Sequence, residues 1–195
     1  MKIVKVKPNS AEIKRLCSRS VAPTKEIQAK VNQILFDVRT HGLPKVIEYA
    51  QAYDGLKGNR LRVSESVIEK AAQKTPPALQ KALKQAIRNV KVFHQNQVEE
   101  SWQITGKDGV VLGQRIRPMR RVGLYVPGGS GTYPSTVIMC AVPAIVAGVS
   151  EVVVVTPIKD DLQPSLAFVL RELGITEVYH VGGAQAIGLL AYGAK

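Results

Sequence analysis

The chain has 195 residues, of which 45% are hydrophobic and 22% charged, as is ordinary for a soluble globular protein of one large or two small domains. No stretch approaches the roughly 18 apolar residues of a membrane span, and the N-terminus lacks the apolar run of a secretory signal, so we expect neither a membrane protein nor a secreted one. Two distant cysteines, Cys17 and Cys140, fit a reducing, cytoplasmic location, and the apolar surroundings of Cys140 predict a place in the core.

The net charge of +12 is distributed unevenly along the chain. Residues 1–121 hold 24 of the 27 lysines and arginines, and such a basic region can indicate nucleic-acid binding. These basic side chains are interleaved with Glu and Gln over several amphipathic segments, without an Arg-rich run or an alternation with aromatic residues. This pattern is typical of solvated helix faces and disfavours nucleic acid as a partner.

Residues 1–100 are predicted to form a helical region. Hydrophobic spacing, capping residues and prolines indicate helices over 24–42 and 43–53, a brief strand at 61–63, and further helices from 64 and from 77 onward. Near residue 100 the hydrophobic period changes. Residues 101–120 are therefore predicted to form a β-hairpin connection with a glycine-containing turn.

Residues 121–195 alternate between apolar runs and helical patterns. We expect strands at 121–126, 151–156 and 177–181, and helices at about 134–147, 163–173 and 184–191, the first of them kinked or divided by Pro143. A local repeat, GVSEV at 148–152 and GITEV at 174–178, is typical of successive βα units. The fold class is therefore α/β with a parallel sheet, incomplete at its C-terminal end because so few strands leave an apolar sheet edge.

Two junctions of strand, glycine turn and helix are the most informative features. The strand at 122–126 leads into PGGSG at 127–131, and the strand at 177–181 leads into Gly182-Gly183. Such a turn can hold a phosphate against backbone N–H groups and a helix N-terminus. However, Pro134 stands where the dinucleotide fingerprint needs its third glycine, and a lysine-containing phosphate loop is absent. Spacing alone leaves two interpretations open, a site for an anionic ligand and two tight βα turns.

Two polar side chains stand where open α/β sheets bind ligands. Tyr125 ends its strand, and Gln185 begins the helix after the second glycine turn. The alternatives are a tyrosine that anchors a strand end and a glutamine that caps its own backbone. The three histidines show no zinc-ligand spacing, and His180 is expected to be packed or hydrogen-bonded rather than catalytic.

These motifs carry a resemblance to a known family. The sequence RVGLYVPGGSGTYPSTVIMCAVPAIVAGVSEVVVVTP, followed by GITEVYHVGGAQAIGLLAYG, closely resembles histidinol dehydrogenase, and the earlier chain is similar in layout. The resemblance implies Rossmann-like domains of the aldehyde dehydrogenase type in a homodimer. It implies oxidation of L-histidinol to L-histidine through the aldehyde, with NAD and zinc. It also implies cofactor contacts from Tyr125 and Gln185. Gly128 and Gly129, in the first glycine turn, are the further cofactor contacts that we expect.

The zinc ligands, the acid–base residues and a further asparagine of this family lie downstream of Lys195. The resemblance therefore implies the NAD-binding N-terminal portion of the enzyme, inactive by itself, with no catalytic or metal-binding residue in this chain. The expected division is a helical region at 1–100, the hairpin connection at 101–120, and an incomplete nucleotide-binding unit at 121–195. A non-catalytic α/β binding or assembly module is the main alternative, and a basic nucleic-acid-binding protein is a less favoured one.

Overall fold

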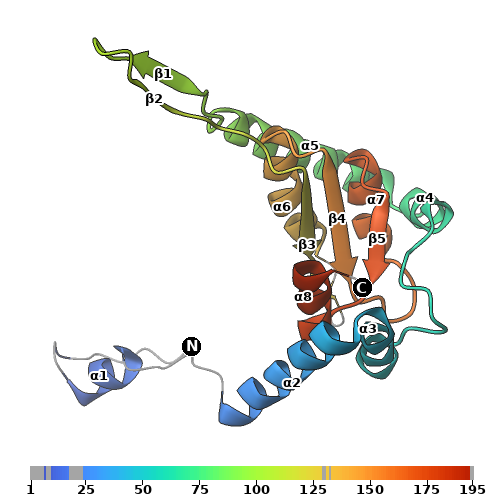
Figure 1. Ribbon diagram of the computed structural model, residues 1–195. Helices are drawn as coiled ribbons and strands as arrows, with labels where there is room; N and C mark the ends of the chain where they lie inside the picture. Colours follow the sequence, from blue (N-terminus) through green and yellow to red (C-terminus); the bar gives the residue numbers. More distant parts are fainter. Residues whose placement is uncertain (1–6, 8–9, 18–23, 129–130, 132, 194–195) are drawn as a thin grey trace. The chain divides into compact units, whose positions relative to one another are not determined.

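The computed structural model describes residues 7, 10–17, 24–128, 131 and 133–193 (Figure 1). The chain divides into two compact units, Met1–Gln33 and Ile34–Lys195. Helix α1 (Ala11–Cys17) lies in the first unit, and α2 (Lys25–His41) begins there and ends in the second. Within the described parts of the chain, no helix combines the length and the apolar character needed to cross a membrane.

A three-stranded parallel sheet forms the centre of the second unit. Its strands are β3 (Arg121–Tyr125), β4 (Glu151–Thr156) and β5 (Glu177–His180), in the order β3-β4-β5. Tyr125 pairs with Val155, and Val155 pairs with Tyr179, so the three carboxyl ends meet at one edge of the sheet. The predicted α/β fold with a parallel sheet is confirmed.

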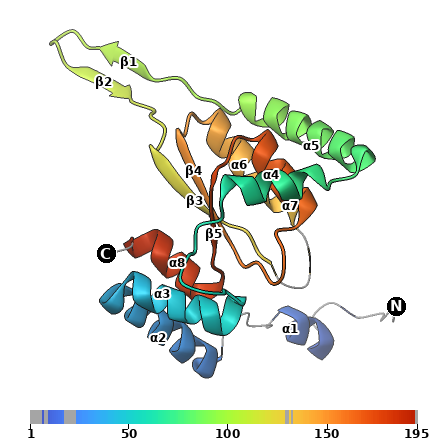
Figure 2. The ribbon, with the colours of Figure 1, turned by 90° about the vertical axis from the view of Figure 1, so that its right-hand side faces the viewer.

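Four helices lie on one side of this sheet. They are α4 (Glu65–Gln73), α5 (Pro77–Gln95), α6 (Pro134–Val146) and α7 (Pro164–Glu172). Helix α6 contacts β3 and β4 directly. Helix α4 packs against α7, and α5 packs against both α6 and α7 (Figure 2). The core between helices and sheet contains the fully buried Phe168, Val137, Val154 and Val178. Because burial of such side chains is the main source of folding free energy, this layer fixes the sheet.

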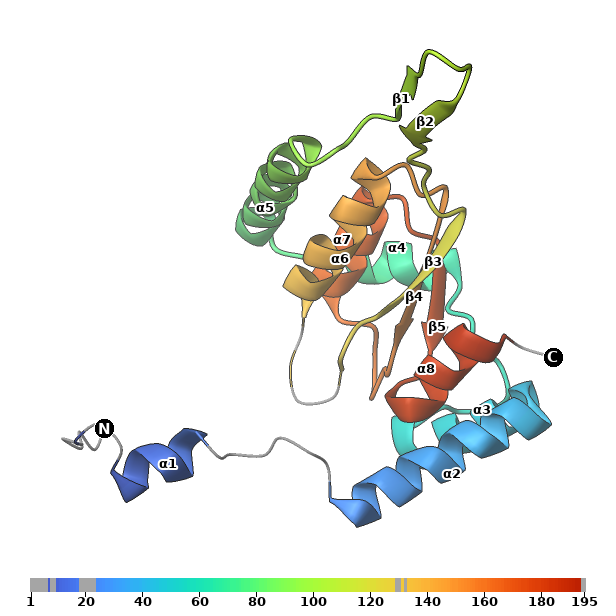
Figure 3. The same cartoon turned by 60° about the vertical axis from the view of Figure 1, so that its left-hand side comes forward.

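The opposite face carries a second, smaller core. Helix α8 (Gly183–Tyr192) packs here with α3 (Leu43–Tyr49), which continues into the π-helical turn η1 (Ala50–Asp54). The C-terminal part of α2 lies against α8 (Figure 3). The contact is so close that a Cβ on Gly188 would stand only 3.1 Å from a methyl group of Val38. Val155 and Val181 supply the strand side of this core.

The βα repeat of the sequence has a direct structural counterpart. Gly148 (φ 88°) and Gly174 (φ 68°) adopt left-handed backbone after α6 and α7, a conformation that glycine adopts without steric penalty. Both helices begin with a proline in the first turn, where the missing N–H is not needed. The strand–helix alternation predicted from residue 121 is thus confirmed.

The predicted hairpin is also present. Strands β1 (Trp102–Thr105) and β2 (Val111–Gln114) pair antiparallel, with Trp102 opposite Gln114. Every residue of both strands is exposed. The division of the chain into parts at 1–100, 101–120 and 121–195 remains a prediction.

Three local expectations differ from the structure. The segment 61–63 forms a single antiparallel bridge, Arg62 to Tyr179, so it lies along the outer edge of β5 without becoming a strand of its own. Pro143 lies inside α6 without dividing it, and the kink that was the other expectation at this position stays a prediction. The prediction that Cys140 is buried is wrong. The buried residues of helix α6 are Val137, Ile138, Ala141 and Val142. They define the buried face of the helix, and residue 140 points away from that face.

Candidate functional site

Three loops meet at the carboxyl ends of the parallel strands. Pro157, directly after β4, lies between the two glycine turns that follow β3 and β5. A Cβ on Gly128 would overlap the Pro157 carbonyl oxygen, and a Cβ on Gly182 would lie 2.9 Å from Pro157 Cγ. The close approach of the loops therefore requires glycine at both positions, independently of any ligand.

Gln185 lies in the first turn of α8, directly after the second glycine turn, and is only 2% exposed. Its Nε2 donates to Oδ2 of Asp54 over 3.0 Å, and the Gly182 N–H donates to the same oxygen over 2.9 Å. Asp54 is the last residue of η1 and is half-buried. The start of α8 therefore faces a carboxylate from a segment 131 positions earlier in the chain.

This carboxylate changes what the second turn offers to a ligand. A helix N-terminus carries partial positive charge and favours an anion. Asp54 already supplies a negative charge at this end of α8 and accepts the hydrogen bond of the Gly182 N–H. A phosphate placed there would meet a like charge, so the second turn is better suited to an uncharged hydrogen-bonding group. In the first turn, the predicted contact Gly129 lies outside the described residues.

His180 is hydrogen-bonded, as expected from its place in a strand. Its Nε2 lies 2.9 Å from the backbone oxygen of Asp54. Because a carbonyl oxygen only accepts, Nε2 of His180 carries the proton in this bond. Asp54 thus binds the end of β5 through its backbone and the start of α8 through its side chain.

Tyr125 lies at the end of β3 and is 37% exposed. Two residues earlier, Gly123 faces α8, since a Cβ there would overlap a methyl group of Leu190. Alternate residues of a strand point to the same face, so Tyr125 also belongs to the α8 face. The structure therefore places Tyr125 and Gln185 on the same side of the sheet.

A polar cavity of about 340 Å³ opens at this carboxyl edge, between the loops after β3 and β4. Its lining includes Gly128, Thr156, Lys159 and Gln163. The volume is within the range of about 300–1,000 Å³ that is usual for small-molecule sites. Of the predicted contacts that the structure describes, Gly128 lines this cavity, whereas Tyr125 and Gln185 lie outside it on the α8 face.

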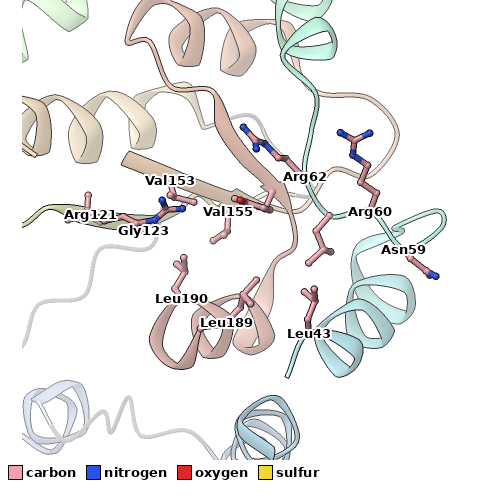
Figure 4. Close-up of a pocket in the computed structure, with 14 residues that line it drawn as sticks. Leu43, Asn59, Arg60, Arg62, Arg121, Gly123, Val153, Val155, Leu189 and Leu190 are labelled. Carbon is pink, nitrogen blue, oxygen red and sulfur yellow. The ribbon is translucent and has the colours of Figure 1, made fainter. Parts of the chain in front are cut away.

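A larger cavity, of about 570 Å³, lies on the α8 face toward the amino ends of the strands. Figure 4 shows Leu189 and Leu190 of α8 beneath Val153 and Val155 of β4. Arg121 lines it too, but its guanidinium is bound to Glu151 and Glu177 at 2.6 Å each. These hydrogen bonds raise the pKa of Arg121, and the bond to Glu151 contributes more than the bond to Glu177. Ligands of open parallel sheets bind at the carboxyl ends of the strands. This apolar cavity lies toward the amino ends and is therefore not part of the candidate site.

Metal ligands do not gather in the part of the chain that the structure describes. No group of three His, Cys, Asp or Glu side chains is close enough there to hold a metal ion. A catalytic zinc ion requires about three protein ligands. The described residues do not fit a zinc site, and no zinc chemistry is assigned to them.

Asp54 is the residue of this site that sequence reasoning missed. Asp54-Gly55 ends a helical segment, and such a pair is an ordinary turn signal. Its partners Gly182 and Gln185 follow well over a hundred residues later. No local pattern connects these segments.

Comparisons with known proteins agree with this architecture. The model of the histidinol dehydrogenase family matches residues 17–195. The chain is 43% identical over 190 residues to histidinol dehydrogenase from Carboxydothermus hydrogenoformans, covering 96% of this chain and 45% of that protein. It is 45% identical over 188 residues to the enzyme from Synechococcus sp., covering 94% and 43%. The crystal structure of histidinol dehydrogenase from Elizabethkingia anophelis matches with a TM-score of 0.85 at 30% identity, covering 96% of this chain and 44% of that one.

The chain therefore spans a little under half the length of these relatives. The family model nevertheless covers nearly all of it. This chain belongs to the histidinol dehydrogenase family of oxidoreductases.

Proposed function

We propose that this chain is the NAD-binding N-terminal portion of a histidinol dehydrogenase that oxidises L-histidinol to L-histidine, through the aldehyde, in histidine biosynthesis. The observation that carries the proposal is the family match over residues 17–195, together with the parallel sheet that this match covers. The complete enzyme is proposed to be a cytoplasmic homodimer, as the family resemblance implies.

The proposed share of this segment in the reaction is to bind and orient the cofactor. NAD, when bound, accepts a hydride from the substrate. Tyr125 and Gln185, on one side of the sheet, and the turn containing Gly128 and Gly129 are the proposed contacts. The residues that hold zinc and move protons are proposed to lie in the portion of the family that this chain does not span.

Binding of NAD to the purified chain tests the cofactor role. We expect saturable binding by calorimetry, and an affinity about tenfold lower in Gln185→Ala, because one hydrogen-bonding side chain is lost. Gln103→Ala, in the exposed strand β1, is the matched control and keeps wild-type affinity. A folded chain that binds no NAD would contradict the cofactor role of the isolated chain.

Turnover tests the proposed inactivity. We expect the pure chain to produce no NADH from histidinol and NAD, with or without added zinc. Steady NADH formation at 340 nm by this chain alone would refute the assignment of the chemistry to the remaining portion of the enzyme.

A further inference from the structure

We infer that Asp54 is a positioning residue that fixes the orientation of the Gln185 amide at the cofactor site. Its effect on cofactor affinity rests on the proposed function, whereas its effect on the Gln185 side chain does not. Asp54 and Gln185 are 131 positions apart in the sequence. The side-chain amide of Gln185 and the backbone N–H of Gly182 both donate to one oxygen of the Asp54 carboxylate.

The backbone around Asp54 is held firmly in place. The π-helical turn η1 begins at Ala50, which is fully buried. It is followed by Gly55 in left-handed conformation, whose N–H donates to the Ala50 oxygen. The next residue, Leu56, is only 7% exposed. π-helical turns are rare and often occur at functional sites. Asp54 is the last residue of this turn.

The Asp54 carboxylate determines whether the nitrogen or the oxygen of the Gln185 amide faces Asp54. An ionised carboxylate only accepts hydrogen bonds, so the amide nitrogen of Gln185 must face Asp54. The amide oxygen is then directed away from Asp54, on the side where Gly183 lies. A ligand that reaches this amide oxygen meets an acceptor, which binds hydroxyl or N–H groups and not a phosphate oxygen.

The two glycines of the turn agree with this role of Asp54. A Cβ on Gly182 would lie 2.9 Å from Asp54 Oδ1, so a larger residue would push the carboxylate away. Gly183 has φ 58°, in the left-handed region, which glycine adopts without steric penalty where the chain enters α8. Asp54 and Pro157 thus both exclude a side chain at Gly182, whereas Gly183 is required by its own backbone conformation.

The variants Asp54→Ala, Asp54→Asn and Gln185→Ala test the inference in the full chain. Asp54→Ala removes the acceptor. Asp54→Asn keeps one oxygen that can accept both hydrogen bonds, removes the charge and replaces the other oxygen with an NH₂ group. The matched control is Asp108→Ala, an exposed aspartate in the hairpin turn. If Asp54→Ala does not fold, Asp54→Leu takes its place, since leucine keeps the volume and lacks an acceptor.

The first measurement is the NMR signal of the Gln185 side-chain NH₂ in uniformly ¹⁵N-labelled chain, assigned by its loss in Gln185→Ala. We expect slow exchange with water and a shift away from that of a free amide in the wild type, in Asp54→Asn and in the control. Both features are lost in Asp54→Ala. An unchanged Gln185 signal in Asp54→Ala would overturn the inference.

The second measurement is NAD affinity in a double-mutant cycle. We expect Asp54→Ala to weaken binding about tenfold in the wild-type background and to have little further effect in the Gln185→Ala background. Asp54→Asn is expected to restore most of the affinity. Equal losses in both backgrounds would show a general structural effect and overturn the positioning role. If the wild-type chain binds no NAD, the proposed function of this chain fails, and the NMR signal alone decides the role of Asp54.

Discussion

Substitution of Gly128 separates a packing role for the first glycine turn from a cofactor role. Gly128 does not have left-handed backbone, so alanine can adopt its backbone conformation without strain. The added methyl group would overlap the backbone oxygen of Pro157, which cannot rotate aside as a side chain would. We therefore expect Gly128→Ala to destabilise the folded chain even when no cofactor is present.

The expected loss in the free energy of unfolding is about 1–3 kcal/mol, the usual range when an extra carbon is forced into a packed region. For a chain of this size, each kcal/mol lowers the melting temperature by about 2–4 °C. Urea unfolding followed by circular dichroism, with a thermal melt of the same sample, gives both quantities. The slope of the urea transition should stay constant, because the exposed surface does not change.

Gly123→Ala is the matched control in the same strand–turn segment. Its methyl group would meet the tip of the Leu190 side chain, which can change rotamer. Alanine is also favoured over glycine inside a strand by about 0.5–1 kcal/mol. The two effects oppose each other, so we expect a change within about 1 kcal/mol for Gly123→Ala. Equal stability of wild type and Gly128→Ala, combined with loss of NAD binding, would refute the packing argument and leave Gly128 as a cofactor contact only.

Two further predictions concern polar groups outside the candidate site. Arg121→Met removes ion pairs to Glu151 and Glu177 from a side chain that is 43% exposed. We therefore expect urea unfolding to show a loss in the free energy of unfolding below about 1 kcal/mol, and a smaller loss in 1 M salt. A loss of several kcal/mol would contradict this expectation. The hydrogen bond from Tyr49 to Asp37, with burial, raises the pKa of Tyr49 from 10.0 to about 12. The folded state therefore holds this proton more tightly, and its contribution to stability is complete below pH 10 and lost as the pH rises toward 12. Stability measured across this interval should fall less steeply in Tyr49→Phe, and equal slopes would show that another group is responsible.

Secondary structure could be predicted because its signals are local. The apolar run of β4 and the glycines that end α6 and α7 act on their immediate neighbours, so periodicity and turn chemistry identify the βα units. The predicted positions of Tyr125 at a strand end and Gln185 at a helix start are correct for the same reason. The family resemblance added the proposed roles of these two residues, which neither spacing nor periodicity supplies.

The environment of each residue could not be predicted in this way. Cys140 lies among apolar residues in sequence, yet it is exposed, because burial depends on which face of α6 meets its neighbours. The glycines at 128 and 182 suggested a phosphate, but what requires them in the structure is Pro157 and, at the second turn, Asp54. These contacts join segments that are far apart along the chain.

By itself, the sequence determined the alternating βα pattern, the hairpin and the glycine turn before α8, since each depends on backbone preferences within a few residues. Only the tertiary structure decided that Asp54 reaches the start of α8 and holds Gln185. The physical reason is that a hydrogen bond depends on distance and direction, and for residues 131 positions apart both are set by how the helices and the sheet pack.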